Sequence, residues 1–168
     1  TVYMLELPKN DADLVDTGLM LFREMGGRLT LDPAAIEREK GVVLSELRTR
    51  STPEYRAFES RWRLSYEGQR QAVRLPIGKA ETIKGATLEI LADYYRRYYR
   101  PERTLLVATG DFDPSDLEAR IKARFSDWRG EGEDPADPEQ RPVKARGIVA
   151  ASHVEANLPE SATVTWFR

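Results

Sequence analysis

The chain has 168 residues, of which 26 are basic (Lys or Arg) and 28 are acidic, so its net charge is −2. This near balance argues against nucleic acid or an anionic membrane as the main partner. The absence of cysteine excludes disulfides, thiolate nucleophiles and cysteine-ligated zinc. We expect no transmembrane segment, because no apolar run approaches the roughly 18 residues that cross a bilayer. The length suffices for one domain and the edge of a second.

The first part of the chain predicts one strand followed by two helices. "TVYMLEL" is rich in residues that favour strands, and it ends at Pro8. The next pattern predicts a helix over about 11–25, closed by the two glycines that follow it. The Asp-Pro pair at 32–33 indicates an N-cap and a first helical residue, and the helical pattern then continues to about residue 50.

The middle of the chain alternates helical and strand-like patterns. Helices are expected over about 54–66 and 87–99, the second stopped by a proline shortly afterwards. "RTLLVATG", residues 103–110, is a continuous apolar run that predicts a buried strand. A second Asp-Pro pair predicts a helix over about 113–128. The sequence therefore predicts mixed α and β structure.

The composition changes after Trp128. "RGEGEDPADPEQRP" consists mainly of glycine, proline and acidic residues, which predicts a linker over 129–146. Residues 147–168 contain "GIVAASHVE" and "ATVTWF", which alternate like two strands. We therefore expect an incomplete domain at 1–128, a linker, and a β segment that either returns to the first sheet or begins the next domain. Because the chain opens at Thr1 directly into a strand-like sequence, we expect it to be a piece of a longer protein.

The helix that starts after the first Asp-Pro pair carries two glutamates among apolar residues. At about 100° per residue, Glu39 and Glu46 fall in the same arc as Val43 and Leu47. A carboxylate that faces a core is unfavourable unless it is paired, hydrogen-bonded or bound to a metal. One interpretation is pairing with arginines or backbone amides, since Glu46 is correctly spaced for an i,i+4 ion pair with Arg50. The other is a site in which one acid binds a metal and the other supports it.

Other residues give weaker signals of chemistry. Zinc sites combine carboxylate with imidazole or thiolate ligands, and the only histidine is His153, which we interpret as an ordinary strand or surface residue. A zinc site that uses the two glutamates therefore needs ligands from outside these residues. The run "YYRRYYR" mixes aromatic and basic side chains as an RNA-binding surface does. Because Tyr95 and Tyr99 follow Leu91 at helical spacing, however, they are interpreted as part of a core stripe.

Several stretches resemble a known family. "IEREKGVVLSEL", residues 36–47, is similar to the downstream glutamate motif of the insulinase/pitrilysin zinc metallopeptidases, the inverzincins, whose other motif is H-x-x-E-H. "LPIGKAETIKGATLEILADYYRRYYRPERTLLVATGDFD", residues 75–113, resembles the next block of the same family. "TVYMLELP" and "FSDW" also fit. The resemblance covers nearly the whole chain.

The family resemblance implies a fold and a set of site residues. The fold is α+β, with helices that cover a mixed, largely antiparallel sheet as in insulinase and mitochondrial-processing-peptidase domains, here truncated at its N-terminus. Glu46 matches the third zinc ligand, and Glu39 matches the second acid that supports the site. No histidine precedes Glu46, so the two histidine ligands and the general-base glutamate are expected before Thr1.

The function implied by the resemblance is zinc-dependent endopeptidase activity on peptides or small unfolded proteins. Zinc is expected in the full-length protein and not in this chain alone, which we expect to be inactive by itself. The expected partners are a peptide or unfolded-protein substrate and the remaining domains of the polypeptide or a homologous subunit. The expected compartment is the bacterial periplasm or envelope, with the cytoplasm as the alternative. The alternative function is a non-catalytic family member that acts as a structural or peptide-binding partner subunit.

Overall fold

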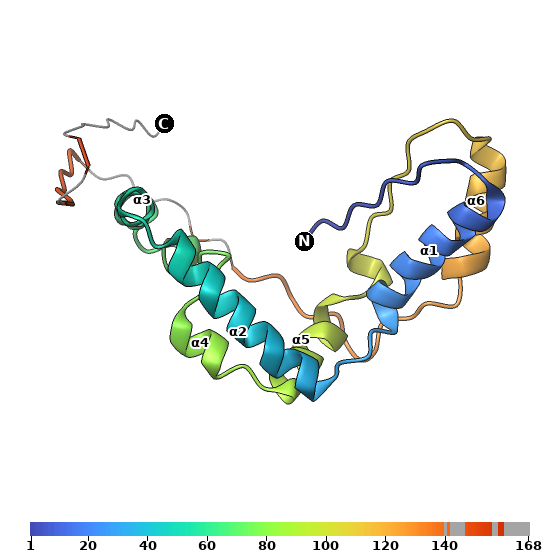
Figure 1. The fold of residues 1–168 in the computed structure, drawn as a ribbon, viewed down its shortest axis with the longest axis horizontal. Helices are drawn as coiled ribbons and strands as arrows, with labels where there is room; N and C mark the ends of the chain where they lie inside the picture. Colours follow the sequence, from blue (N-terminus) through green and yellow to red (C-terminus); the bar gives the residue numbers. More distant parts are fainter. Residues whose placement is uncertain (140, 142–146, 156–157, 160–168) are drawn as a thin grey trace. The chain divides into compact units, whose positions relative to one another are not determined.

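The computed structural model describes residues 1–139, 141, 147–155 and 158–159, and every regular element in them is a helix (Figure 1). The α-helices are α1 (Ala12–Gly27), α2 (Pro33–Arg50), α3 (Pro53–Ser65), α4 (Ala80–Lys84), α5 (Leu88–Tyr98) and α6 (Pro114–Phe125). Two short 3₁₀ helices are η1 (Arg70–Val73) and η2 (Pro101–Arg103). Among the described residues, no helix combines the length and the apolar character needed to cross a bilayer.

The predicted α+β fold with a largely antiparallel sheet is wrong, because the described part of the chain contains no strand. Residues 1–7 and 104–109 form no regular element, although both were expected to be strands. A strand requires backbone hydrogen bonds to a neighbouring segment, and neither segment makes such bonds with a distant part of the described chain. Their apolar side chains are consequently exposed, Met4 by 88% and Leu105 by 86%. Residues 147–155 form no strand either, and the strand expected at 162–167 lies outside the described residues.

The helix starts are confirmed, and local hydrogen bonds explain them. α2 and α6 each begin at the proline of an Asp-Pro pair. The Asp113 carboxylate accepts hydrogen bonds from the backbone N–H groups of Ser115 at 2.8 Å and Asp116 at 3.0 Å. These bonds satisfy N–H groups that have no partner within the helix. Thr52 and Thr87 cap α3 and α5 in the same way.

The chain divides into two compact units. Unit 1 consists of Thr1–Asp32 and Thr87–Ala136, and it holds α1, α5, η2 and α6. Unit 2 consists of Pro33–Ala86 and Asp137–Arg168, and it holds α2, α3, η1 and α4. Each unit is therefore assembled from two separate stretches of sequence.

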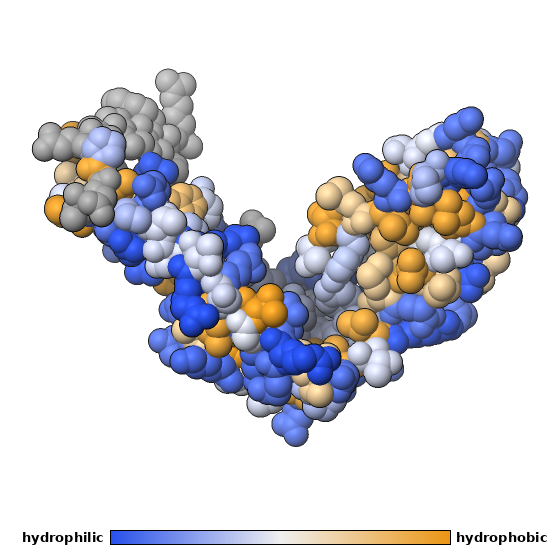
Figure 2. All heavy atoms as spheres, in the orientation of Figure 1, coloured by the Kyte–Doolittle hydropathy of each residue, from blue (hydrophilic) through white to orange (hydrophobic). Residues whose placement is uncertain are grey.

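Unit 1 is built around the packing of α1 against α6. Leu19 on α1 and Leu117 on α6 are buried, and Trp128 is buried just beyond the end of α6. At the surface of this interface, Arg120 Nη1 lies 3.0 Å from an oxygen of Asp16. Figure 2 shows that hydrophobic side chains also remain exposed on the surface of the part that holds α1 and α6. Unit 1 thus combines a small core with an exposed apolar surface.

The glycine pair at the end of α1 allows the helix to approach Trp128. Gly26 and Gly27 were expected to close the helix, but they form its last turn, and their φ angles are not positive. A Cβ atom on Gly26 would lie 2.8 Å from Trp128 Cη2, and one on Gly27 would lie 2.6 Å from Trp128 Nε1. Both distances are too short for a side chain. The pair is therefore required by close packing against the indole ring.

Unit 2 is packed more loosely. α2 lies against α4, and no residue of either helix is buried. α3 carries three rings at helical spacing, and Tyr66 directly after the helix continues the series. Trp62 Nε1 donates a 2.8 Å hydrogen bond to the carbonyl of Gln71 in η1. This bond holds the end of α3 to η1, where Ala72 is buried.

Candidate functional site

The two candidate glutamates both lie on α2, and both are exposed. Glu39 and Glu46 are separated by seven residues, or about 10 Å along the helix axis. Glu46 Oε1 lies 2.6 Å from Arg50 Nη2, and the Glu46 side chain is 44% exposed. This is the i,i+4 ion pair that the spacing predicts. Glu39 makes no ion pair with any described residue.

The expected burial of these acids is not found. Val43 and Leu47 on the same arc are only half-buried, and Val42 is exposed. Because both carboxylates are exposed in the described structure, water solvates them, and neither needs a neutralising partner for the helix to form. The angular pattern correctly places the acids beside apolar residues, but that face is open in the described structure.

The fit of the described residues to zinc can be judged from their donor atoms. A carboxylate such as that of Glu46 is a suitable zinc ligand, and its exposed oxygens are accessible to an ion. The described residues contain no cluster of three or more His, Cys, Asp or Glu side chains that could hold a metal. Glu39 is too far along the helix to bind the same ion as Glu46. Glu39 and Glu46 therefore do not form a metal site by themselves within the described part of the chain.

His153 belongs to a different polar cluster, within unit 2. Its Nε2 lies 3.1 Å from Glu155 Oε1. Both oxygens of Glu155 accept hydrogen bonds from Arg56, at 2.6 Å from Nε and 2.7 Å from Nη2. The Arg56 guanidinium, with a smaller contribution from His153, lowers the pKa of Glu155 to about 2. The cluster attaches residues 153–155 to α3, which agrees with the interpretation of His153 as an ordinary surface residue.

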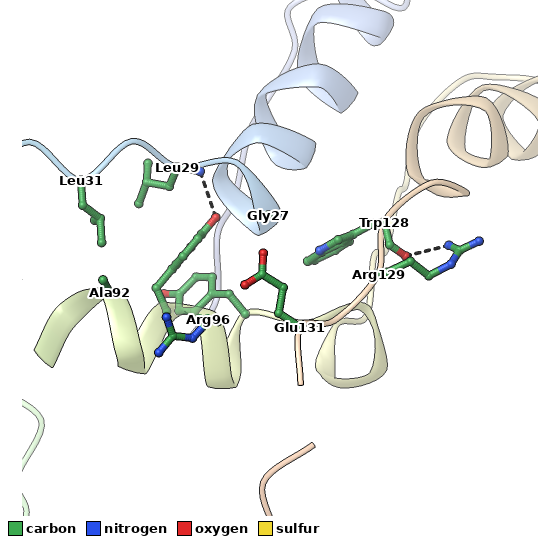
Figure 3. A pocket seen from close by; sticks show the side chains of 10 residues that line it. Gly27, Leu29, Leu31, Ala92, Arg96, Trp128, Arg129 and Glu131 are labelled. Atoms are coloured by element: carbon green, nitrogen blue, oxygen red, sulfur yellow. Dashed lines mark hydrogen bonds between the residues drawn. The ribbon is translucent and has the colours of Figure 1, made fainter. Parts of the chain in front are cut away.

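Unit 1 contains an aromatic pocket of about 350 Å³ between the end of α1, α5 and the segment after α6. In Figure 3, Leu29 and Leu31 lie on one side of the pocket, Trp128 lies on the other, and the Glu131 carboxylate lies between them. The residues that line it are Gly27, Leu29, Leu31, Ala92, Tyr95, Arg96, Tyr99, Trp128, Arg129 and Glu131.

The two tyrosines of this pocket have structural hydrogen bonds. The Tyr95 hydroxyl donates to the carbonyl of Met25 at 2.8 Å and accepts from the N–H of Leu29 at 3.1 Å. The hydroxyls of Tyr99 and Tyr3 are 2.6 Å apart. Burial, together with the hydrogen bond to Tyr3, raises the pKa of Tyr99 to about 12. Both tyrosines therefore stay neutral near pH 7 and hold segments together. They are only half-buried, and no residue of α5 is buried, so the stripe expected to lie in a core is only partly covered in the described structure.

The start of the predicted linker is fixed to unit 1 by a buried arginine that the sequence reading did not single out. Arg100 is only 4% exposed. Its Nη1 donates to the carbonyl of Glu131 at 2.5 Å, and its Nη2 donates to that of Gly132 at 3.2 Å. A Cβ atom on Gly130 would overlap the guanidinium, at 2.5 Å from Cζ. The glycines of this acidic segment thus allow the backbone to wrap around Arg100, which appears in the sequence as the last residue of the run "YYRRYYR", directly before a proline.

Comparison with known proteins identifies a family. Residues 85–163 match the family model described as the Peptidase M16 inactive domain. The chain is 30% identical over 139 residues to an Arabidopsis thaliana protein named "Zinc protease PQQL-like", and 29% identical over 126 residues to a probable zinc protease PqqL of Haemophilus influenzae. These alignments cover 82% and 75% of the chain, but only 14% of each relative. The chain therefore spans about one seventh of the length of these curated relatives.

Solved structures give a consistent result. The first half of the periplasmic protease PqqL from Escherichia coli matches with a TM-score of 0.75 and 25% identity, covering 83% of this chain and 30% of that one. The ferredoxin protease FusC, solved in complex with Arabidopsis ferredoxin, matches with a TM-score of 0.75 and 26% identity, covering 82% of this chain and 15% of that one. Glu39 and Glu46 both lie before the region that matches the inactive-domain model.

Proposed function

Because this chain belongs to the M16 family of peptidases, we propose that it is part of a zinc-dependent endopeptidase in which Glu46 is a zinc ligand. The observation that carries the proposal is the similarity to proteins named zinc proteases, which covers 82% of the chain in the Arabidopsis relative. The proposed substrates are peptides or small unfolded proteins. The chain alone would be inactive, because the other zinc ligands would come from residues outside those described.

The surroundings of Glu46 support its proposed role. Its partner Arg50 is exposed, and an exposed ion pair contributes only about 0–1 kcal/mol, so the carboxylate can exchange it for a metal at little cost. A position on an eighteen-residue helix fixes the direction of the carboxylate better than a loop does. When bound, zinc supplies Lewis-acid polarisation of a carbonyl and lowers the pKa of its bound water.

Glu39 is proposed to support the site rather than to bind the ion. It lies two helical turns before Glu46, about 10 Å away along the axis. A carboxylate at that distance acts by accepting a hydrogen bond from another ligand and so fixing its orientation. No described residue forms an ion pair with Glu39, so its carboxylate is available for such a contact.

The partners and the compartment are proposed from the relatives. The Escherichia coli relative is named a periplasmic protease, which supports a bacterial periplasm or envelope location for the protein that contains this chain. The ferredoxin complex of FusC supports a protein or peptide as substrate. The chain spans only a small part of its relatives, which supports the remaining domains of one polypeptide, or a homologous subunit, as its structural partners.

A second candidate function is a non-catalytic family member that acts as a structural or peptide-binding subunit. The match of residues 85–163 to an inactive-domain model favours it. The two candidates differ in one feature of sequence. An H-x-x-E-H motif encoded in the fifty or so residues before Thr1 would support the peptidase, and its absence would support the non-catalytic subunit.

The test of the proposed function is Glu46→Gln in the protein that contains this chain. We expect zinc content and hydrolysis of a quenched fluorescent peptide to fall together, because glutamine replaces a charged ligand with a neutral one. Glu39→Gln should weaken zinc binding or activity by about 10- to 100-fold, the usual effect of losing a supporting group. Glu37→Gln is the matched control, since Glu37 is exposed on the same helix and paired with Lys40. Unchanged zinc content in Glu46→Gln would overturn the ligand assignment.

A further inference from the structure

Unit 2 contains a hollow of about 530 Å³ where α3 turns into η1. Its volume falls within the range of roughly 300–1,000 Å³ that is usual for ligand sites. Four arginines contribute to its wall, together with one acidic residue. The residues that line it are Arg63, Glu67, Gly68, Gln69, Arg70, Ala72, Val73, Arg74 and Arg141.

The turn that forms this hollow is held by specific contacts. Gly68 has a φ of +81°, which favours glycine, and the N–H of Gln69 donates to the carbonyl of Tyr66 at 2.9 Å. The hydrogen bond from Trp62 Nε1 to the carbonyl of Gln71 fixes η1 against α3. Gln69 Nε2 also donates to the carbonyl of Arg141 at 2.5 Å. These contacts hold the turn between α3 and η1 that forms the hollow.

The arginines of the hollow differ from most others in the chain. Within the described residues, none of the four forms an ion pair, and their side chains are exposed. Arginines elsewhere, such as Arg28, Arg56 and Arg120, pair with carboxylates at 3.1 Å or less. In a chain with net charge −2, this is a local excess of positive charge with only Glu67 to offset it.

We propose that this hollow binds the carboxylates of an acidic peptide segment. The planar guanidinium matches a carboxylate in two parallel hydrogen bonds. Ala72, which is buried, and Val73, which is exposed, also line the hollow, so it offers apolar contact for the methylene groups of a peptide. This combination suits a chain that carries Glu or Asp side chains.

The same features fit nucleic acid less well. Binding to a phosphate backbone requires a basic stripe that follows several phosphates. The positive charge here is confined to one hollow that also contains Glu67, on a chain that is acidic overall. The proposed peptide site does not depend on the proposed zinc site, because it uses none of the same residues.

The proposal is tested by fluorescence anisotropy with the whole chain and a labelled decapeptide of alternating Glu and Gly. We expect the Glu peptide to bind, and a peptide with Gln in place of Glu to bind at least about tenfold more weakly. The triple variant Arg63→Gln, Arg70→Gln, Arg74→Gln should lose about tenfold or more in affinity for the Glu peptide. The corresponding triple Lys variant should lie between it and the wild type, because lysine keeps the charge but not the two-pronged geometry.

A matched control distinguishes binding at this hollow from a general effect of the net charge of the chain. Arg38, Arg61 and Arg124 are exposed and lack an ion pair with any described residue, so the triple variant Arg38→Gln, Arg61→Gln, Arg124→Gln makes the same change of net charge elsewhere. It should change peptide affinity by less than about twofold. An equal loss in this control, equal binding of the Glu and Gln peptides, or tighter binding of a single-stranded decanucleotide than of the Glu peptide would each overturn the proposal.

Discussion

The two units of the chain differ in how many apolar side chains they bury and in which candidate binding sites they contain. Among the described residues, three of the four buried apolar side chains are in unit 1, namely Leu19, Leu117 and Trp128, whereas unit 2 buries only Ala72. The candidate zinc ligand and the arginine-lined hollow both lie in unit 2. Packing and proposed chemistry are thus separated. Substitutions in unit 1 should act mainly on stability, and those in unit 2 mainly on binding.

The largest expected effect is that of Trp128→Ala in unit 1. Trp128 is buried against the last turn of α1, and Arg23 lies with its Cζ 5.3 Å from the ring centroid. Removing such a ring should lower the free energy of unfolding by about 3–5 kcal/mol. Urea denaturation followed by circular dichroism measures this loss.

Trp62→Ala in unit 2 is the comparison for Trp128→Ala. Trp62 is only half-buried, so its removal should lower the free energy of unfolding by less, about 1–2 kcal/mol. Equal losses in the two variants would contradict the difference in packing between the units.

The next largest effects are expected at two glycines, where substitution by alanine should change the free energy of unfolding in opposite directions. Gly27→Ala places a methyl group 2.6 Å from Trp128 Nε1 and 2.7 Å from Arg23 Nη1, which should destabilise the protein by about 1–3 kcal/mol. Gly41→Ala in α2 meets no atom within 4 Å and should stabilise it by about 0.5–1 kcal/mol, because alanine favours the helix. The same denaturation measurement applies, and a destabilising Gly41→Ala would show that α2 is covered on that side.

The smallest changes in stability are expected when two side chains titrate, one at high pH and one at low pH. The pKa of Tyr99 in unit 1 is raised to about 12, so its contribution to stability is complete below about pH 10 and is lost as the pH rises towards 12. The pKa of Glu155 in unit 2 is lowered from 4.5 to about 2, so its contribution is present above pH 4.5 and is lost as the pH falls towards 2. Carbon-13 NMR titration of both side chains measures the two transitions. Tyr99→Phe should weaken the alkaline dependence of the free energy of unfolding, and Glu155→Gln should weaken its acidic dependence. A variant with the same pH dependence of stability as the wild type would refute the assignment for that residue.

The sequence predicted those features of the fold that depend on neighbouring residues. The starts of α2 and α6 follow from Asp-Pro pairs, whose capping and backbone preferences act within one turn. The prediction of a sheet was wrong because strand pairing depends on a second segment. The apolar run at 103–110 indicates burial but does not identify the segment with which it would pair. The contacts of Arg100 with the acidic segment were missed for the same reason, since they join residues about thirty positions apart.

The candidate site shows the same limit. The i,i+4 spacing correctly predicted the ion pair between Glu46 and Arg50. Helical angles also placed Glu39 and Glu46 on one face beside apolar residues. They did not predict that this face is open, because an angle states which residues share a face and not whether another element covers it.

The proposed role of Glu46 is tested most directly by measuring the position of zinc relative to its carboxylate. Anomalous diffraction at the zinc edge, from crystals of the protein that contains this chain, locates the ion without relying on activity. We predict a zinc peak about 2.0–2.2 Å from a carboxylate oxygen of Glu46, with Glu39 out of direct contact. A bound zinc with no contact to Glu46, and with Glu46 still paired to Arg50, would contradict this prediction.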